Sequence, residues 1–280
     1  MRHTGESPPS VSERVLDVLD AFSSERPALS LSELSRRTGI PLSSTHRIVA
    51  GLVRRGALER DGASRYRVGL WVWEVASLSS HGMGLRESSM PFLEDLYEAT
   101  HQNVQLAVLD VPDVVYLERI SGRGAVNVVS RAGGRLPAHA TGVGLVLLAH
   151  APAEVQEDML AGPLKRYTDR TISSSSQLRR VLADVRRDGF AISDGQIELP
   201  ALSVAAPVQG PGDHVVAAIS VVVPSTGTDP RTLVPAVRAA ARGISRALGA
   251  PSATRMSREA FRETSTEWKE RGGAEAGNAG

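Results

Sequence analysis

Arginine is concentrated near the start of the chain, in a pattern suited to binding a polyanion. Residues 36–67 hold eight arginines and only two acidic residues, Glu59 and Asp61, whereas the whole chain has a net charge of +1. The only two lysines are Lys165 and Lys269. Guanidinium groups donate hydrogen bonds to phosphate oxygens and to guanine edges, so this segment predicts contact with nucleic acid. The alternative is a solvated helical surface, which charge runs commonly form.

The segment from Pro41 to Arg54 has the spacing of a helix with one apolar face and one basic face. The apolar stripe consists of Thr45, Ile48, Val49 and Leu52. The opposite side carries small, hydroxylic or basic side chains and no acidic residue. A merely solvated helix usually mixes acids with bases, so we expect this face to enter a DNA major groove. Groove contacts are expected from Ser43, Ser44, His46 and Arg47, and phosphate contacts from Arg36, Arg54, Arg60, Arg65 and Arg67.

The elements around this helix predict a winged helix-turn-helix over residues 10–70. A first helix runs from Val11 to Phe22, and a second begins with a capping box of Ser30 and Glu33. Gly39 supplies the left-handed stop of the second helix, before the basic helix begins. A hairpin with basic strands follows, with its turn at 61–64, and completes the wing.

Composition excludes several classes of protein. Cysteine is absent, which excludes disulfides, cysteine-ligated zinc, iron–sulfur clusters and a thiol nucleophile. The seven histidines are scattered, so we expect no metal and no cofactor. Aromatic residues make up 4%, which disfavours a protein that stacks single-stranded bases. There is no apolar run of membrane-spanning length and no apolar signal segment, so we expect a cytoplasmic protein without a membrane partner.

The second half alternates strand-like and helix-like segments. Linker helices are expected at 71–100 and a domain at 101–250, followed by a flexible tail at 251–280. The expected strands are 103–109, 114–120, 125–130, 202–208 and 215–223. Helices are expected at 137–149, from Leu178 to Val185, and from Leu233 to Leu248. Hairpins and helices in this order predict an α+β fold on an antiparallel sheet.

Small residues gather at the start of the helix expected after Pro137. The run from Ala140 to Gly144 lets a ligand approach the free N–H groups of the first turn, where the helix dipole favours a carboxylate. Close packing of the helix on the sheet is the alternative explanation of the same glycines. His139, beside this run, has no Ser or carboxylate at a diagnostic spacing, so we expect a structural histidine and no enzyme activity.

Three segments of the chain resemble the IclR type of bacterial transcriptional regulators. The first half resembles the DNA-binding domain of that family through the sequence LSLSELSRRTGIPLSSTHRIVAGLVRRGALERDGASRYRVGL. The second half resembles its sensor domain through GGRLPAHATGVGLVLLA and GFAISDGQIELPALSVAAPV. The resemblance covers residues 10–250 and implies a GAF-like effector-binding domain, linker helices that join a dimer interface, and a homodimer or a dimer of dimers.

The resemblance also implies a set of effector contacts. These are Gly142, Val143, Ser193, Asp194, Ala201, Ser203, Ser220 and Val222. The chain departs from the family pattern at four positions. Leu145 stands where the family has a lysine, and Ser193 stands where it has an acidic residue. Gln196 replaces a glutamate, and Val222 replaces a residue with a hydroxyl group. These changes make the pocket less polar, so we expect a bulkier or aromatic organic acid as the effector.

The sequence as a whole predicts a regulator of transcription, with repression as the favoured action. A small organic acid would favour one arrangement of paired readers and thereby change their affinity for double-stranded operator DNA. One alternative is a metabolic enzyme that uses its helix-turn-helix only for assembly. That class predicts an acid-rich third helix or a Ser/His/Asp spacing, and the sequence has neither. A structural DNA protein without a ligand is the second alternative, which the long second domain disfavours.

Overall fold

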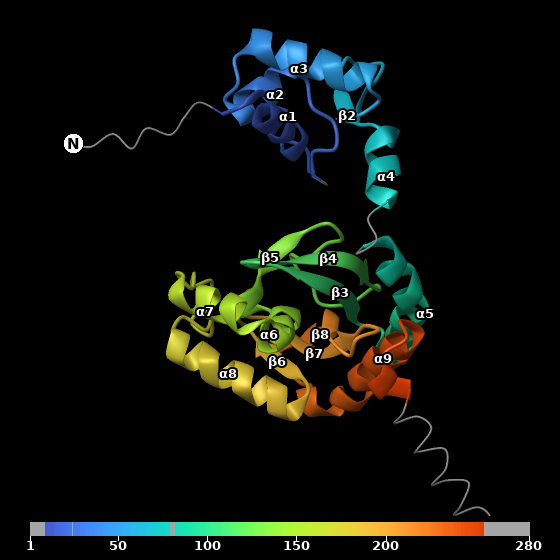
Figure 1. Cartoon of the computed structure of the whole chain (residues 1–280), viewed down its shortest axis with the longest axis vertical. Coiled ribbons are helices and arrows are strands. Elements are labelled where there is room, and N and C mark those ends of the chain that lie inside the picture. Colours follow the sequence, from blue (N-terminus) through green and yellow to red (C-terminus); the bar gives the residue numbers. More distant parts are fainter. Residues whose placement is uncertain (1–8, 24, 79–81, 255–280) are drawn as a thin grey trace, which may run out of the picture. The chain divides into compact units, whose positions relative to one another are not determined.

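The computed structural model describes residues 9–23, 25–78 and 82–254. They fall into two compact units that divide between Met83 and Gly84, and Figure 1 shows the elements of each. Within the described residues, no helix combines the length and the apolarity that crossing a bilayer requires. The predicted α+β class, with a helix-turn-helix before an antiparallel sheet domain, is confirmed.

The first unit is a three-helix core with a two-stranded wing. Its elements are α1 Val11–Asp20, α2 Leu31–Thr38, α3 Leu42–Arg54, β1 Leu58–Arg60, β2 Tyr66–Val68 and α4 Leu70–Ser77. Capping boxes begin α1 and α2 at Ser10 and Ser30, and Gly39 ends α2 with a φ of 70°. Reciprocal backbone hydrogen bonds between Leu29 and Tyr66 tie the wing to the segment before α2.

The second unit is built on a six-stranded antiparallel sheet with the order β5-β4-β3-β8-β7-β6. The strands are β3 Asn103–Asp110, β4 Asp113–Ile120, β5 Arg135–Pro137, β6 Ala191–Asp194, β7 Ala201–Gln209 and β8 Val215–Pro224. The helices are α5 Met83–Thr100, α6 Gly142–His150, α7 Ala153–Ala161, α8 Ser175–Asp188 and α9 Val234–Ala247. A 3₁₀ turn, Ala138–Ala140, precedes α6, and another, Pro230–Thr232, precedes α9.

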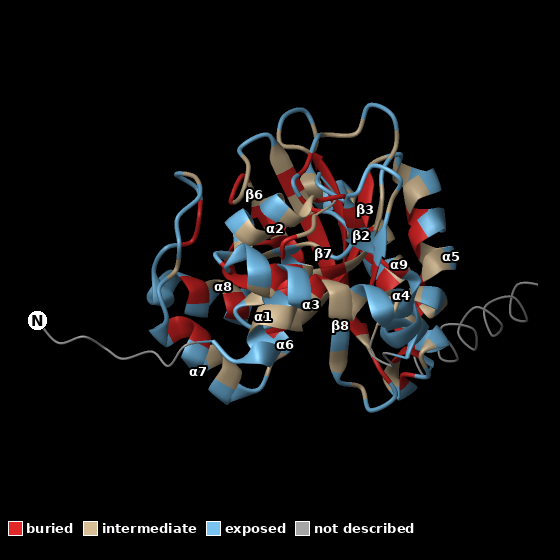
Figure 2. Ribbon diagram, turned by 90° about the horizontal axis from the view of Figure 1, so that it is seen from above, coloured by how far each residue is buried: buried red, intermediate tan, exposed pale blue. Residues whose placement is uncertain are grey.

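Helices cover both faces of this sheet, as Figure 1 shows, with α6 and α8 on one face and α5 and α9 on the other. Side chains alternate between the two faces along each strand. On β7, Ala205 packs toward α6 and α8, whereas Val204 and Ala206 pack toward α5 and α9. Figure 2 shows the central strands largely in the colour of buried residues. Both layers of core therefore depend on the same strands.

The expected strand at 125–130 is wrong. The chain there is irregular, and β5 at Arg135–Pro137 pairs with β4 instead. The physical reason is that side chains of β3 hold the segment: Asn103 Nδ2 donates to the Val126 carbonyl at 2.7 Å, and Gln105 Nε2 donates to Ser130 Oγ at 2.6 Å. A backbone ladder would not leave room for these contacts.

Two short elements and part of the expected tail differ from the prediction. Strand β6 and helix α7 were not expected. Residues 251–254 are helical and ordered, because Ser252 Oγ donates to Asp213 Oδ1 at 2.6 Å and Ala253 is buried. The rest of the tail expected at 251–280 lies outside the described residues.

Helices α5 and α9 approach each other closely at Gly243 of α9. A Cβ atom on Gly243 would lie 2.5 Å from two carbons of the Phe92 ring. Gly243→Ala is therefore expected to overpack this contact and to lower the free energy of unfolding by about 1–3 kcal/mol, measured by urea denaturation.

Gly84→Ala, in α5, is the matched control, since no atom lies within 4 Å of the added carbon. This variant is expected to be as stable as the wild type. Equal stability of the two alanine variants would show that the close approach of α9 to α5 does not limit packing.

Candidate functional site

The outer face of α3 presents hydrogen-bond donors that have no partner in the part of the chain that the structure describes. Ser43, His46 and Arg47 are exposed, and among the described residues their side chains have no hydrogen-bond or ion-pair partner. Thr45 points the other way, buried, with Oγ1 donating to the Ile40 carbonyl at 3.1 Å. The predicted separation of an inward and an outward face is therefore present, and Ser44 lies half-buried between the two.

The start of α3 adds backbone donors to this face. Its N-cap residue is Pro41, and no side chain caps the helix. The first N–H groups of α3 are thus directed outward beside Ser43 and Ser44, at the positive end of the helix dipole. Arg54, at the end of α3, and Arg36, on α2, are both exposed. Such a surface binds phosphates through its backbone and arginines, and reaches base edges through its side chains.

The three wing arginines have different surroundings. Arg60 lies over the Tyr66 ring, 5.9 Å from its centre, and Arg67 Nε lies 3.6 Å from Asp61 Oδ2. Hydrogen bonds from the Arg65 and Ala63 backbone lower the pKa of Asp61, so this turn keeps its negative charge. Arg65 donates through Nη2 to the Ala28 carbonyl and lies 3.7 Å from Glu33 Oε2. Arg65 thus fastens the wing to the segment before α2, whereas Arg60 and Arg67 extend from the wing surface.

The second unit contains a pocket of about 430 Å³ on the sheet face that α6 covers. Five of the predicted effector positions line it, namely Gly142, Ser193, Ala201, Ser203 and Val222. Strand register brings three of them into one row, since Ser193 is opposite Ser203 and Ser203 is opposite Val222. Side chains from three strands and the start of one helix therefore meet in one cavity.

The other three predicted positions are placed outside this lining. Val143 is buried in the core beneath α6. Asp194 accepts from Arg170 Nη1 through Oδ2 at 2.7 Å. Ser220 Oγ donates to Gln105 Oε1 at 3.3 Å and so holds an amide that does line the pocket. The side chain of Val143 is therefore outside the pocket, and Ser220 lies behind its wall.

The first turn of α6 offers unpaired backbone donors to the pocket. Thr141 caps the helix, with its Oγ1 accepting from Gly144 N at 3.2 Å. The N–H groups of Gly142 and Val143 have no acceptor among the described residues. Because Thr141 and Gly142 line the cavity, these donors and the helix dipole suit an anionic ligand group.

The two glycines of this turn serve different purposes. A Cβ atom on Gly144 would lie 2.2 Å from the Ala138 carbonyl oxygen, so this glycine is required for packing. A Cβ atom on Gly142 would lie 2.7 Å from Ser203 Oγ, a side chain of the pocket. Gly144 is therefore explained by close packing, whereas Gly142 borders the pocket.

Several polar groups of the pocket were missed or given no binding role in the sequence analysis. They are Gln105, Tyr116, Ser130, Thr141, Gln196 and Glu198. Burial raises the pKa of the Tyr116 hydroxyl, which therefore stays neutral. A signal was available for Gln105, because Asn103 and Gln105 place two amides on one face of an otherwise apolar strand. Amides at that spacing need partners from elsewhere in the fold.

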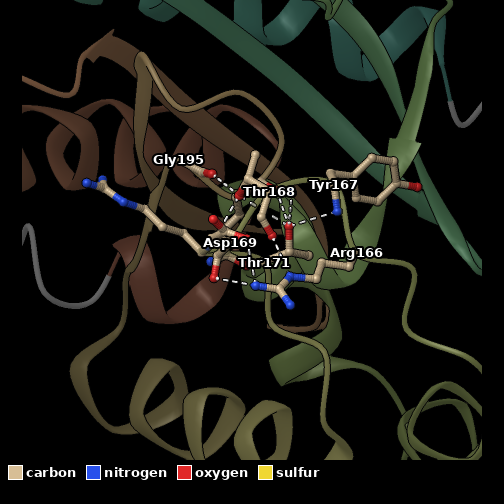
Figure 3. Close-up of polar contacts among 8 residues, drawn as sticks. Arg166, Tyr167, Thr168, Asp169, Thr171 and Gly195 are labelled. Atoms are coloured by element: carbon tan, nitrogen blue, oxygen red, sulfur yellow. Dashed lines mark hydrogen bonds and ion pairs between the residues drawn. The ribbon is translucent and has the colours of Figure 1, made fainter.

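Loops from three parts of the chain are joined around the pocket. Figure 3 shows Thr168 Oγ1 donating to the Gly195 carbonyl at 2.6 Å, with Thr171 beside it. Thr171 Oγ1 likewise donates to the Gln196 carbonyl at 2.6 Å. On the other side, Glu198 Oε2 accepts from Val129 N at 3.1 Å. These bonds fix the 195–198 wall against its neighbours.

Other sites considered from the sequence have structural roles. His139 is buried, and its Nε2 lies 3.0 Å from the Lys165 carbonyl oxygen, as expected for a histidine that braces a loop. In the part of the chain that the structure describes, no three His, Asp or Glu side chains gather as a metal site.

Comparisons with known proteins cover nearly the whole described chain. Residues 77–246 match the model for the bacterial transcriptional regulator IclR C-terminal domain, and residues 10–62 match the IclR helix-turn-helix domain. The HTH-type transcriptional regulator XynR of Escherichia coli is 30% identical over 245 residues, which cover 86% of this chain and 97% of XynR. The Pca regulon regulatory protein of Pseudomonas putida is 28% identical over 210 residues, covering 74% and 72% of the two chains.

A solved structure is similar in both sequence and fold. It is an IclR homologue from Microbacterium hydrocarbonoxydans in complex with 4-hydroxybenzoate, 38% identical, with a TM-score of 0.81. The match covers 85% of this chain and 99% of that one.

The amide row of β3 generates the second prediction. Asn103 Oδ1 accepts from Arg119 Nη2 at 3.0 Å, and its Nδ2 holds the Val126 carbonyl. Asn103→Ala removes both bonds and is expected to lower the free energy of unfolding by about 1–3 kcal/mol. Backbone amides of residues 121–130 should then exchange hydrogen faster, as measured by mass spectrometry. Asn127→Ala, an exposed side chain of the same loop without a hydrogen-bond partner, is the control. Unchanged exchange in the Asn103 variant would contradict this role.

Proposed function

The chain belongs to the IclR family of bacterial transcriptional regulators, and from this premise we propose that it is a dimeric repressor released from operator DNA by a small aromatic acid. The relatives are regulators and not enzymes. The observation that carries the proposal is the presence of two unsatisfied donor sets. Among the described residues, the donors on the α3 face of the first unit have no partner, and the N–H groups of Gly142 and Val143 in the second unit have no acceptor.

DNA recognition is assigned to α3 and the wing. Arg47 is exposed, carries no ion pair among the described residues and stands on a helix without acids. With Ser43, Ser44 and His46 it forms the proposed base-reading surface. Arg36, Arg54, Arg60 and Arg67 are the proposed phosphate contacts, while Arg65 is proposed to position the wing as well as to approach the backbone of the DNA. This activity takes place in the cytoplasm, where the operator is.

The proposed dimer is supported by the exposed side chains of α4 and by the demands of reading a DNA sequence. Helix α4 has no buried residue: Trp71 is 42% and Trp73 56% exposed, and Leu78, directly after the helix, is 82% exposed. A patch of that kind marks an interaction site. One winged helix reads only a short DNA sequence, so a two-fold operator requires a second DNA-binding domain. A second copy of the chain would supply this domain and would also bury the exposed side chains of α4.

The pocket supports an aromatic acid as the effector. Its carboxylate would accept from the N–H groups of Gly142 and Val143, and its apolar body would pack against Ala201, Val222 and Val128. The hydroxyl of a compound such as 4-hydroxybenzoate, the ligand of the Microbacterium homologue, would meet the amide and hydroxyl groups of Gln105 and Ser130. The proposed effector binds one dimer arrangement better than the other and so shifts the population of DNA-competent readers.

The DNA assignment predicts a specific loss of affinity. Arg47→Ala is expected to weaken binding to a duplex selected by the wild-type protein from a random library. The expected loss is about 1–3 kcal/mol, the worth of a bidentate contact to a base, measured by fluorescence anisotropy. Arg187→Ala is the control, because Arg187 is paired with Asp184 and Asp188 in the other unit. The same affinity for the Arg47 variant and the wild type would refute α3 as the reader.

The effector assignment predicts a loss of response without a loss of DNA binding. Gly142→Val places a Cβ atom 2.7 Å from Ser203 Oγ and crowds the backbone donors. We expect this variant to bind the operator normally and to ignore 4-hydroxybenzoate, which should weaken the operator affinity of the wild type.

The neutral amide of the same acid separates charge from shape. The amide should act at least about tenfold more weakly than the acid, because a charge-assisted hydrogen bond is worth roughly twice a neutral one. Equal potency of acid and amide, or a full response of the Gly142 variant, would contradict binding of the carboxylate at the start of α6.

A further inference from the structure

A second pocket lies on the opposite side of the sheet from the first. It lies between β7 and α9 and is bordered by Gly189 at the end of α8 and by Ser252 and Ala253. Strand β7 contributes to both pockets, with Ser203 in the first and Ala206 in the second. No residue that the structure describes lines both pockets, so the two cavities are separate.

Two arginines line this second pocket without a carboxylate to balance them. Arg238 and Arg242 are one turn apart on α9, and the lining includes no Asp or Glu. Neither guanidinium has an ion pair or a hydrogen bond within the described residues. Other arginines of the same unit have carboxylate partners, for example Arg170 with Asp194 and Arg179 with Glu157. Two unbalanced positive charges in one cavity favour an anion.

The uncharged groups of the pocket add a donor. The Gln209 side-chain amide lies beside Ser252, whose hydroxyl donates to Asp213 Oδ1 at 2.6 Å and lies 3.1 Å from Gln209 Oε1. The Gln209 amide nitrogen has no acceptor in the described structure. Ser245 is already satisfied, since its Oγ donates to the Ala241 carbonyl at 2.7 Å and accepts from Gln209 N at 2.9 Å. The free polar groups are therefore donors, and a ligand has to supply acceptors.

We propose that this pocket is a second ligand site, which binds a compact dianion independently of the aromatic acid. Arg238 and Arg242 donate to oxygens of the dianion, and Gln209 Nε2 donates to one of these oxygens. Apolar contact comes from Ala206, Pro207 and Ala241, which suits a small carbon body between or beside the charged groups. A phosphate group and a dicarboxylate share this chemistry, and both are tested below.

The experiment is calorimetric titration of the full-length protein with inorganic phosphate and, separately, with succinate, at low ionic strength. The variants are Arg242→Gln and Arg238→Gln; the control is Arg246→Gln, an exposed arginine of the same helix outside the pocket. At least one of the two anions should bind the wild type. Each pocket variant should weaken that binding at least about tenfold, the range expected for a charge-assisted contact, and the control should not. Arg238 is exposed, so its replacement is not expected to affect folding.

Several results would overturn the proposal. The proposal is wrong if neither anion binds the wild type. It is also wrong if the Arg246 control loses as much affinity for the anion as the pocket variants, because binding then depends on diffuse surface charge. Competition between the bound anion and 4-hydroxybenzoate, or loss of anion binding in Gly142→Val, would assign the anion to the first pocket. Undiminished binding by Gly142→Val supports a separate site, whether or not the aromatic acid proves to be the effector.

Discussion

Asn103 and Gln105 face inward from β3, and their amide groups have to find partners inside the protein. Burying an amide in an apolar surrounding without a hydrogen bond costs roughly 2–7 kcal/mol. The chain after β4 supplies the partners, through the Val126 carbonyl and the hydroxyl of Ser130. This requirement brings the loop 121–134 back over the sheet and makes it a wall of the pocket. Arg119 strengthens the same arrangement, donating to Asn103 Oδ1 and to the Ser130 carbonyl. The cavity is thus a consequence of how β3 satisfies its polar side chains.

Local signals made the first unit largely predictable from the sequence. Capping boxes, the left-handed Gly39 and the stripe on α3 are decided by residues a few positions apart, and the structure has them where the sequence places them. Arg65 is the exception, because its contact with Ala28 joins segments 37 residues apart. The second unit was predictable in class but not in detail. The segment 125–130 has strand-forming residues, yet its hydrogen bonds go to side chains of a strand that the sequence does not place beside it.

The pocket shows the same limit at the level of single residues. The motif around Gly142 located the helix start, but the sequence left open whether its glycines serve binding or packing. The packing of α6 distinguishes the two glycines, since Gly142 faces Ser203 on β7 and Gly144 faces Ala138. Glu198 gave no signal at all, because its bond to Val129 N depends on two loops that meet only in the folded state. Predicting such contacts requires the strand order, in which β3 and β8 are neighbours despite their separation along the chain.

The central claim is that the pocket of the second unit and the DNA-reading face of the first are energetically coupled. Thermodynamic linkage makes the coupling reciprocal, so it is measurable from the effector side. The direct test is to titrate 4-hydroxybenzoate into the protein alone and into the protein saturated with its selected duplex. The account predicts weaker binding of the acid to the DNA complex, by the same factor by which the acid weakens operator affinity. Equal affinity of the acid for the free protein and for the complex would contradict the claim.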